Sequence, residues 1–125
     1  MKKIILTLAI VASAALSACK FNPTHNNISI TTQDNPGHLN FTANYPENKT
    51  GATQTYMESF FKEDRIFKSV SDAKKVEVTL KDGTQFYLSY EPGFISINFD
   101  RDKNSYSSYL QMKKMISGFG NVLKD

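Results

Sequence analysis

Cysteine and histidine are nearly absent from this chain of 125 residues, which has one cysteine and two histidines. A single cysteine cannot form an internal disulfide. A zinc site would need nitrogen, sulfur or carboxylate ligands in addition to His25 and His38, and no motif supplies them. The sequence also lacks a G-x-S-x-G turn and a glycine-rich phosphate-binding loop. Without these signatures, the sequence favours a non-catalytic protein and predicts no cofactor.

An excess of charge of one sign is missing as well. The chain has 15 basic and 12 acidic residues, and its formal net charge is +3. Two of the basic residues, Lys2 and Lys3, lie in the N-terminal segment, so the rest of the chain carries 13 basic against 12 acidic residues, or +1. Because nucleic-acid binding relies on a strongly basic patch, we expect no nucleic-acid partner.

The first apolar run of the chain is too short to cross a membrane. It covers Ile4–Ala15, follows two lysines and precedes Leu16-Ser17-Ala18-Cys19, whereas a membrane-spanning helix needs about 20 apolar residues. This segment resembles the signal peptides of bacterial lipoprotein precursors, whose lipobox has leucine first, small residues next and an obligatory cysteine last. All four lipobox positions match, and the resemblance covers residues 1–19.

The resemblance implies cleavage before Cys19 and attachment of palmitate-type acyl chains, which hold a protein durably at a membrane. It divides the chain into a signal peptide (1–18), a lipidated tether (19–27) and one folded domain (28–125). Lys20 stands where aspartate signals inner-membrane retention in enterobacterial relatives, so the expected location is the bacterial cell envelope, at the outer membrane. The alternative is an ordinary secretory signal cleaved after Ala18, with the cysteine there by chance.

Three consecutive strands are predicted in the middle of the domain. Lys74–Lys81, Thr84–Tyr90 and Phe94–Asp100 each alternate apolar and polar side chains, which is the period of a half-buried strand. The rest of the domain is expected to cover or extend this meander.

The turns between these strands agree with the alternation. A three-residue loop ending in Gly83 pairs Val78 with Phe86, whereas a two-residue loop would put the two apolar sets on opposite faces. A Pro92-Gly93 turn, with positive φ at the glycine, does the same for the second and third strands. The three strands therefore share one apolar face and one polar face.

Two further strands are predicted at 28–32 and 39–45, and a helix is predicted on each side of the meander. The first helix is expected to have Thr50 as its N-cap and to continue to about Lys62, and the last to be capped by Asn104 or Ser105. The apolar stripe of the first helix consists of Ala52, Tyr56, Met57, Phe60 and Phe61. The seam of the last consists of Tyr109, Met112, Ile116, Phe119 and Leu123.

The order of these elements is β-β-α-β-β-β-α, with short connections. It predicts an α+β domain in which an antiparallel sheet of about five strands carries both helices on its apolar face. Gly118 and Gly120 weaken the last helix and indicate either a close approach to the sheet or a frayed end.

The polar face of the sheet is the candidate binding surface. The predicted registers align Glu77, Tyr87 and Asn98 in a row across three strands, with Phe94 near the end of the face. Tyrosine is rigid and amphipathic, which suits it to contacts with a partner. The alternative is a solvated face with ordinary cross-strand pairs.

A second candidate segment follows the meander. Asp100, Asp102 and Asn104 place oxygen atoms at alternate positions, as an EF-hand calcium loop does at its start. The segment departs from that loop because Ser105 replaces the required glycine and Gln111 the required glutamate. A strand end, a turn and a helix cap explain the same residues, so these three remain candidate ligands while no metal site is expected.

These observations predict a lipid-anchored cell-envelope protein that acts as a non-catalytic binding or accessory module, of the inhibitor, immunity or assembly-factor type. Its partners would be the membrane, through the N-terminal lipid, and an envelope or secreted protein. The alternative is a small envelope hydrolase or a small-ligand-binding protein that uses the polar sheet face or a cleft between sheet and helices.

Overall fold

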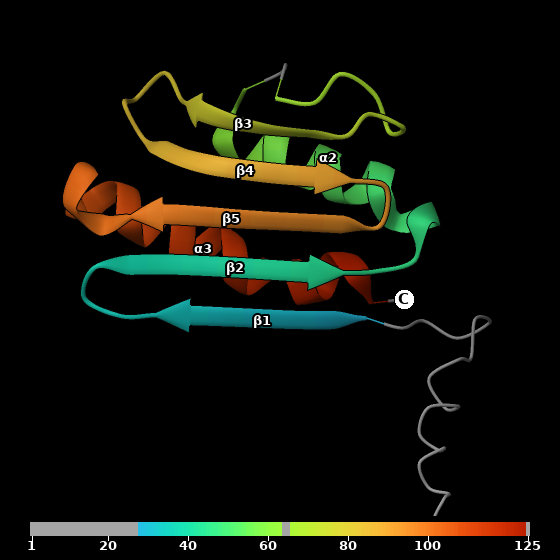
Figure 1. The fold of residues 1–125 in the computed structure, drawn as a ribbon, viewed down its shortest axis with the longest axis horizontal. Helices are drawn as coiled ribbons and strands as arrows, with labels where there is room; N and C mark the ends of the chain where they lie inside the picture. Colours follow the sequence, from blue (N-terminus) through green and yellow to red (C-terminus); the bar gives the residue numbers. More distant parts are fainter. Residues whose placement is uncertain (1–27, 64–65, 125) are drawn as a thin grey trace, which may run out of the picture.

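Five antiparallel strands form one sheet in the computed structural model, which describes residues 28–63 and 66–124. The elements are β1 (Ser29–Asp34), β2 (His38–Asn44), η3 (Glu47–Lys49), α2 (Thr50–Phe61), β3 (Lys74–Thr79), β4 (Gln85–Glu91), β5 (Phe94–Asp100), η4 (Arg101–Lys103) and α3 (Tyr106–Leu123). The strand order is β1-β2-β5-β4-β3. Both α-helices lie on one face of the sheet (Figure 1). The predicted α+β class and order of elements are confirmed.

The hydrophobic core lies between the sheet and the two helices. Every second residue of β2, β4 and β5 is buried, as strand alternation requires. The sheet contributes Leu39, Phe41, Ala43, Phe86, Leu88, Tyr90, Ile95, Ile97 and Phe99. The helices contribute Met57, Phe61, Met112, Met115, Ile116, Phe119 and Leu123. The alternate residues of the three strands therefore face the opposite, polar side.

The two turns of the meander have the predicted lengths. Val78 pairs with Phe86, and the loop is closed by hydrogen bonds from Leu80 N to Thr84 O (2.8 Å) and from Gly83 N to Leu80 O (2.9 Å). Gly83 has φ of +93° and Gly93 has φ of +82°, which are conformations that favour glycine. These two glycines set the register of the three strands.

Strand β3 is less buried than its alternation predicts. Val76 and Val78 pair with buried residues of β4 and lie on the helix side, but Val76 is 37% exposed and Val78 is only half-buried. An edge strand has a neighbour on one side only, and the buried helix residues pack against the inner strands. The alternation therefore gives the correct face of β3 but overstates its burial.

The start of α2 differs from the prediction. Thr50 is the first residue of the helix rather than its N-cap, and its Oγ1 accepts a hydrogen bond from Gly93 N (2.9 Å). The helix is also rotated from the predicted stripe, because Ala52 is exposed while Thr53 and Gln54 are buried. The Thr53 hydroxyl donates to Lys49 O (3.0 Å) and the Gln54 amide donates to Ser69 O (3.1 Å). Because both buried polar groups have partners, the polar positions can face the core.

Helix α3 confirms the predicted seam and the Ser105 cap. All five seam residues are buried, and the Ser105 hydroxyl accepts a hydrogen bond from Ser108 N (3.0 Å). The close approach at Gly118 is to the other helix rather than to the sheet. A Cβ at Gly118 would collide with the Tyr56 hydroxyl, which donates to Met115 O (2.7 Å). The missing side chain lets the tyrosine join the two helices.

Candidate functional site

The predicted polar row is present and extends across the whole sheet. Glu77 pairs with Tyr87, and Tyr87 pairs with Asn98. The row continues through Asn40 of β2 to Gln33 of β1. In Figure 1 this face of the sheet is turned toward the viewer, with the helices behind it. The row is therefore a strip of polar side chains five strands wide, two strands wider than the predicted row.

A second polar row runs parallel to the first. It consists of Lys75, Ser89, Ser96, Thr42 and Thr31. Phe94 lies on the same face but four residues from Asn98 along β5, which is about 13 Å at the rise of a strand. It pairs with Glu91 and Asn44 instead. The structure therefore brings Glu77, Tyr87 and Asn98 together and leaves Phe94 apart from them.

The first row contains one aromatic residue, Tyr87, and it is exposed. Tyr87 is 44% exposed although it lies in an inner strand, and the residues on either side of it in the sequence, Phe86 and Leu88, are buried. It pairs with Glu77 of β3 on one side and with Asn98 of β5 on the other. A rigid aromatic ring flanked by polar groups can contribute both apolar area and hydrogen bonds to an interface.

A hollow of about 320 Å³ lies beside the row, at the end of the sheet where β5 meets η4. Glu77, Tyr87 and Asn98 line it together with Lys103 and His38, which is the first residue of β2. Asp100 and Asn104 also line it, so the two sets of candidate residues meet at one place. The hollow has charged groups of both signs around it.

Two of the three candidate calcium ligands bind backbone groups, and the third, Asp102, is exposed. Asp100 Oδ1 accepts from Asp102 N (2.9 Å) and caps η4. Asn104 Oδ1 accepts from Gln85 N (2.8 Å), and its Nδ2 donates to Gln85 O (3.0 Å) and Asp100 O (2.9 Å). The Asn104 side chain thus bonds both backbone groups of Gln85, as the backbone of a neighbouring strand would. In the described ranges, no cluster of three or more His, Cys, Asp or Glu side chains is placed to hold a metal ion.

Beside the second row, Tyr90 also interacts with a carboxylate. Tyr90 lines a depression together with Lys75, Ser89 and Phe94. Its hydroxyl donates to Asp72 Oδ2 (3.0 Å), and burial, aided by this carboxylate, raises the pKa of Tyr90 to about 12. The hydroxyl therefore stays protonated at neutral pH and connects the segment before β3 to β4. This contact is structural.

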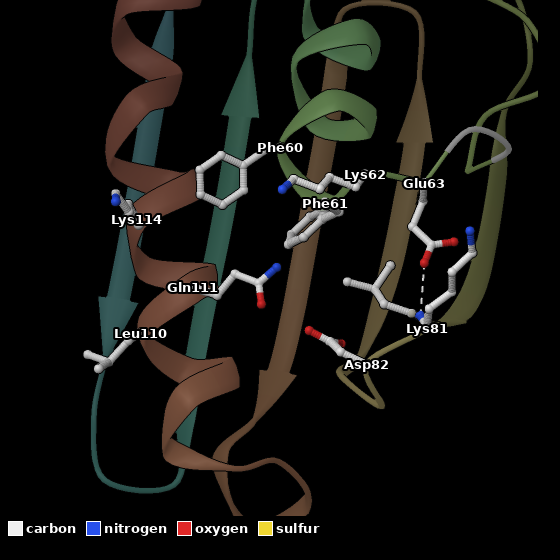
Figure 2. A pocket seen from close by; sticks show the side chains of 10 residues that line it. Phe60, Phe61, Lys62, Glu63, Lys81, Asp82, Leu110, Gln111 and Lys114 are labelled. Carbon is white, nitrogen blue, oxygen red and sulfur yellow. Dashed lines mark hydrogen bonds between the residues drawn. The ribbon is translucent and has the colours of Figure 1, made fainter.

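A larger groove, of about 550 Å³, lies between the end of α2, the exposed side of α3 and the β3–β4 loop (Figure 2). Its apolar lining consists of Phe60, Phe61, Leu80 and Leu110. Its polar lining consists of Lys62, Lys81, Lys114, Glu63, Asp82 and Gln111. No sequence pattern predicts the residues of this groove, because they come from three separate segments, none of which has a recognisable motif.

Among the residues that line this groove, Lys62 has an unusual backbone conformation. It has φ of +59°, the only positive value among the described residues other than glycine, and such a conformation costs about 1 kcal/mol or more. Hydrogen bonds from Lys62 N to Ser59 O (3.3 Å) and from Glu63 N to Glu58 O (3.0 Å) hold it there. Figure 2 shows its side chain above Phe61 and directed toward α3. Glu63 is fixed in turn, accepting from Lys81 N (2.8 Å).

The predicted signal peptide (1–18) and lipidated tether (19–27), which contains Cys19 and His25, lie outside the described residues. Comparison of the chain with protein-family models, curated proteins and solved structures finds no match. Within residues 28–63 and 66–124, no helix is long and apolar enough to cross a membrane.

Proposed function

We propose that the protein is a lipid-anchored component of the bacterial cell envelope, at the outer membrane, whose domain binds an envelope or secreted protein without catalysing a reaction. The observation that carries this proposal is the polar sheet face, five strands wide, with Tyr87 exposed in its row. The helices pack on the opposite face, so a partner can approach this one directly. The lipobox sequence supports the anchor.

The hollow beside the row offers side chains that suit recognition of a protein surface. Its lining includes no serine, threonine or cysteine. The side-chain oxygens Asp100 Oδ1 and Asn104 Oδ1 accept backbone hydrogen bonds. What remains available is a set of groups suited to recognition, led by Glu77, Tyr87 and Lys103, which can pair with charged and amide groups of a protein surface.

Affinity capture from solubilised envelopes tests the binding surface. The wild-type chain should retain a partner that Tyr87→Ala loses, because truncation removes an exposed aromatic from the centre of the contact. Tyr106→Ala is the matched control, since Tyr106 is 67% exposed on α3, outside the polar face. Equal retention by the two variants would contradict the assignment of the partner to this face.

The anchor is tested separately. Cys19→Ala should leave precursor or soluble protein in a membrane fractionation, because the thiol that receives the lipid is gone. Unchanged partition into the membrane would refute lipidation at this cysteine.

The groove of Figure 2 supports a second candidate, binding of a small anionic amphiphile in the cleft between the sheet and the helices. Its lining combines two phenylalanines and two leucines with three lysines. A long-chain fatty acid should then raise the melting temperature of the chain, since a ligand that binds only the folded state stabilises it. Lys62→Glu should abolish that rise, and Lys68→Glu, which is exposed and outside the groove, should preserve it.

A further inference from the structure

Strand β1 is an open edge of the sheet. All six of its residues, SITTQD, are exposed, and its register with β2 runs without a bulge from Ser29 to Asp34. Within the described residues, no strand pairs with its outer side. Edge strands are commonly protected by lysine, proline or bulges. The other edge, β3, has two lysines and a glutamate in six residues, whereas β1 is uncharged until its last residue.

This strand is held in place although none of its residues is buried. Asp34 Oδ2 accepts a hydrogen bond from the Tyr109 hydroxyl (2.8 Å) and lies 3.1 Å from Lys113 Nζ. The Arg101 guanidinium stacks on the Tyr109 ring at 3.7 Å and donates to Asn35 O (3.0 Å). The end of β1 is thereby joined to α3 and η4, so its free backbone groups are ordered before any partner arrives, which reduces the entropy cost of pairing.

An apolar groove of about 360 Å³ lies on the helix side of this edge. Ile30 and Thr32 of β1 form one wall, Leu39 lies beside them, and α3 contributes Lys113, Ile116, Ser117 and Gly120. Ile30 is 39% exposed because no further strand covers it among the described residues. A strand added to β1 would project every second side chain toward this groove.

We propose that β1 pairs antiparallel with β1 of a second copy of this chain, joining the two sheets edge to edge. The strand is self-complementary. Ile30, Thr32 and Asp34 pair with Ala43, Phe41 and Leu39, which are buried on the helix side, so Ser29, Thr31 and Gln33 face the polar side. A two-fold axis normal to the sheet keeps both helical layers on one side and pairs residues of the same side with each other.

When the two β1 strands pair with residues of the same side opposite each other, no like charges face each other at the centre of the interface. Thr31 meets Ser29, Thr31 or Gln33 of the second copy, and in the same three registers Ile30 meets Ile30, Thr32 or Asp34. The charge of Asp34 is already balanced by Lys113 and Arg101. The second copy adds its own Ile30 beside the groove. Both polar faces then point the same way and form one surface twice as wide.

Sedimentation velocity tests the proposal, which depends neither on lipidation nor on the polar-face partner. The buried core lies within residues 39–123, so a soluble chain beginning at Lys20 retains it. That chain should form a reversible dimer as its concentration rises to about 1 mM, since small interfaces are weak. Thr31→Lys and Thr31→Glu should each weaken dimerisation at least about tenfold, because like charges then oppose each other across the strands. An equimolar mixture of the two variants should restore it.

Thr79→Lys is the matched control, a threonine-to-lysine change at the exposed end of the opposite edge strand. It should leave dimerisation unchanged, and circular dichroism should show all three variants folded. A chain that remains monomeric at the highest concentration would overturn the proposal. So would dimerisation that survives both Thr31 changes, or that is lost with Thr79→Lys.

Discussion

Single polar side chains hold the ends of the elements in this domain. Thr50 ties the start of α2 to the β4–β5 turn, and Tyr56 ties α2 to α3. Asn104 contributes three hydrogen bonds between the start of β4 and the end of β5. The sequence suggests other roles for them: a helix cap for Thr50, a place in the apolar stripe for Tyr56 and a metal ligand for Asn104. Their hydrogen-bond partners could not be inferred from the sequence, because Gly93, Met115 and Gln85 are distant along the chain.

Asn104→Ala should lower the free energy of unfolding by about 2–4 kcal/mol. The change leaves a part-buried amide and carbonyl of Gln85 without their partner, and each such group costs about 1–3 kcal/mol. Asp102→Ala is the control, because Asp102 is exposed and a surface change of that kind stays within about 0.5 kcal/mol. Denaturant midpoints of the two variants measure the difference, and equal midpoints would remove the structural role given to Asn104.

Because of Asp34, we expect the stability of the fold to fall as the pH becomes acidic. The hydrogen bond from the Tyr109 hydroxyl, followed by the interactions with Lys113 and Arg101, lowers the pKa of this carboxyl below its ordinary value. The carboxylate therefore stabilises the fold above the unfolded pKa of about 3.9, and this contribution disappears as the pH falls through the folded pKa. Asp34→Asn should lower the melting temperature at neutral pH and reduce its fall below about pH 4. A parallel pH profile in variant and wild type would exclude this role.

At the scale of elements, the contact between α2 and α3 depends on the absence of one side chain. Gly118→Ala places a Cβ against the Tyr56 hydroxyl, so the tyrosine must move and its hydrogen bond to Met115 O is lost. Gly120→Ala meets no atom within 4 Å and should stabilise the helix by up to about 1 kcal/mol. In thermal unfolding, the melting temperature of Gly120→Ala should be higher than that of the wild type, and that of Gly118→Ala should be lower than that of Gly120→Ala. The reverse order would show that the helices are not closely joined there.

The strands of the meander and the seam of α3 could be predicted because their signals are local. Alternation, a glycine at positive φ and recurrence at three and four residues each act within a few neighbours. The rotation of α2 could not be predicted, because Gln54 is buried only by finding Ser69 O, fifteen residues away. The low burial of β3 likewise follows from the strand order, which places it at the edge.

The same distinction applies to the candidate site. The Glu77–Tyr87–Asn98 row follows from two short turns and was predictable, but its continuation through Asn40 and Gln33 depends on the pairing of β2 with β5. That pairing joins residues that are 50 to 62 positions apart in the sequence, and it has no local signal. The groove of Figure 2 is unpredictable for the same reason, since three distant segments form it.

At the scale of the whole molecule, the domain has two unlike faces, one carrying helices and one carrying polar rows. We propose that the polar face is the one that meets a partner in the cell envelope. A photo-crosslinking amino acid placed at position 87 of the full-length chain, within living cells, tests this proposal. We expect a discrete crosslinked product from position 87 and none from position 106 on α3. Crosslinking from position 106 alone, or equally from both positions, would contradict it.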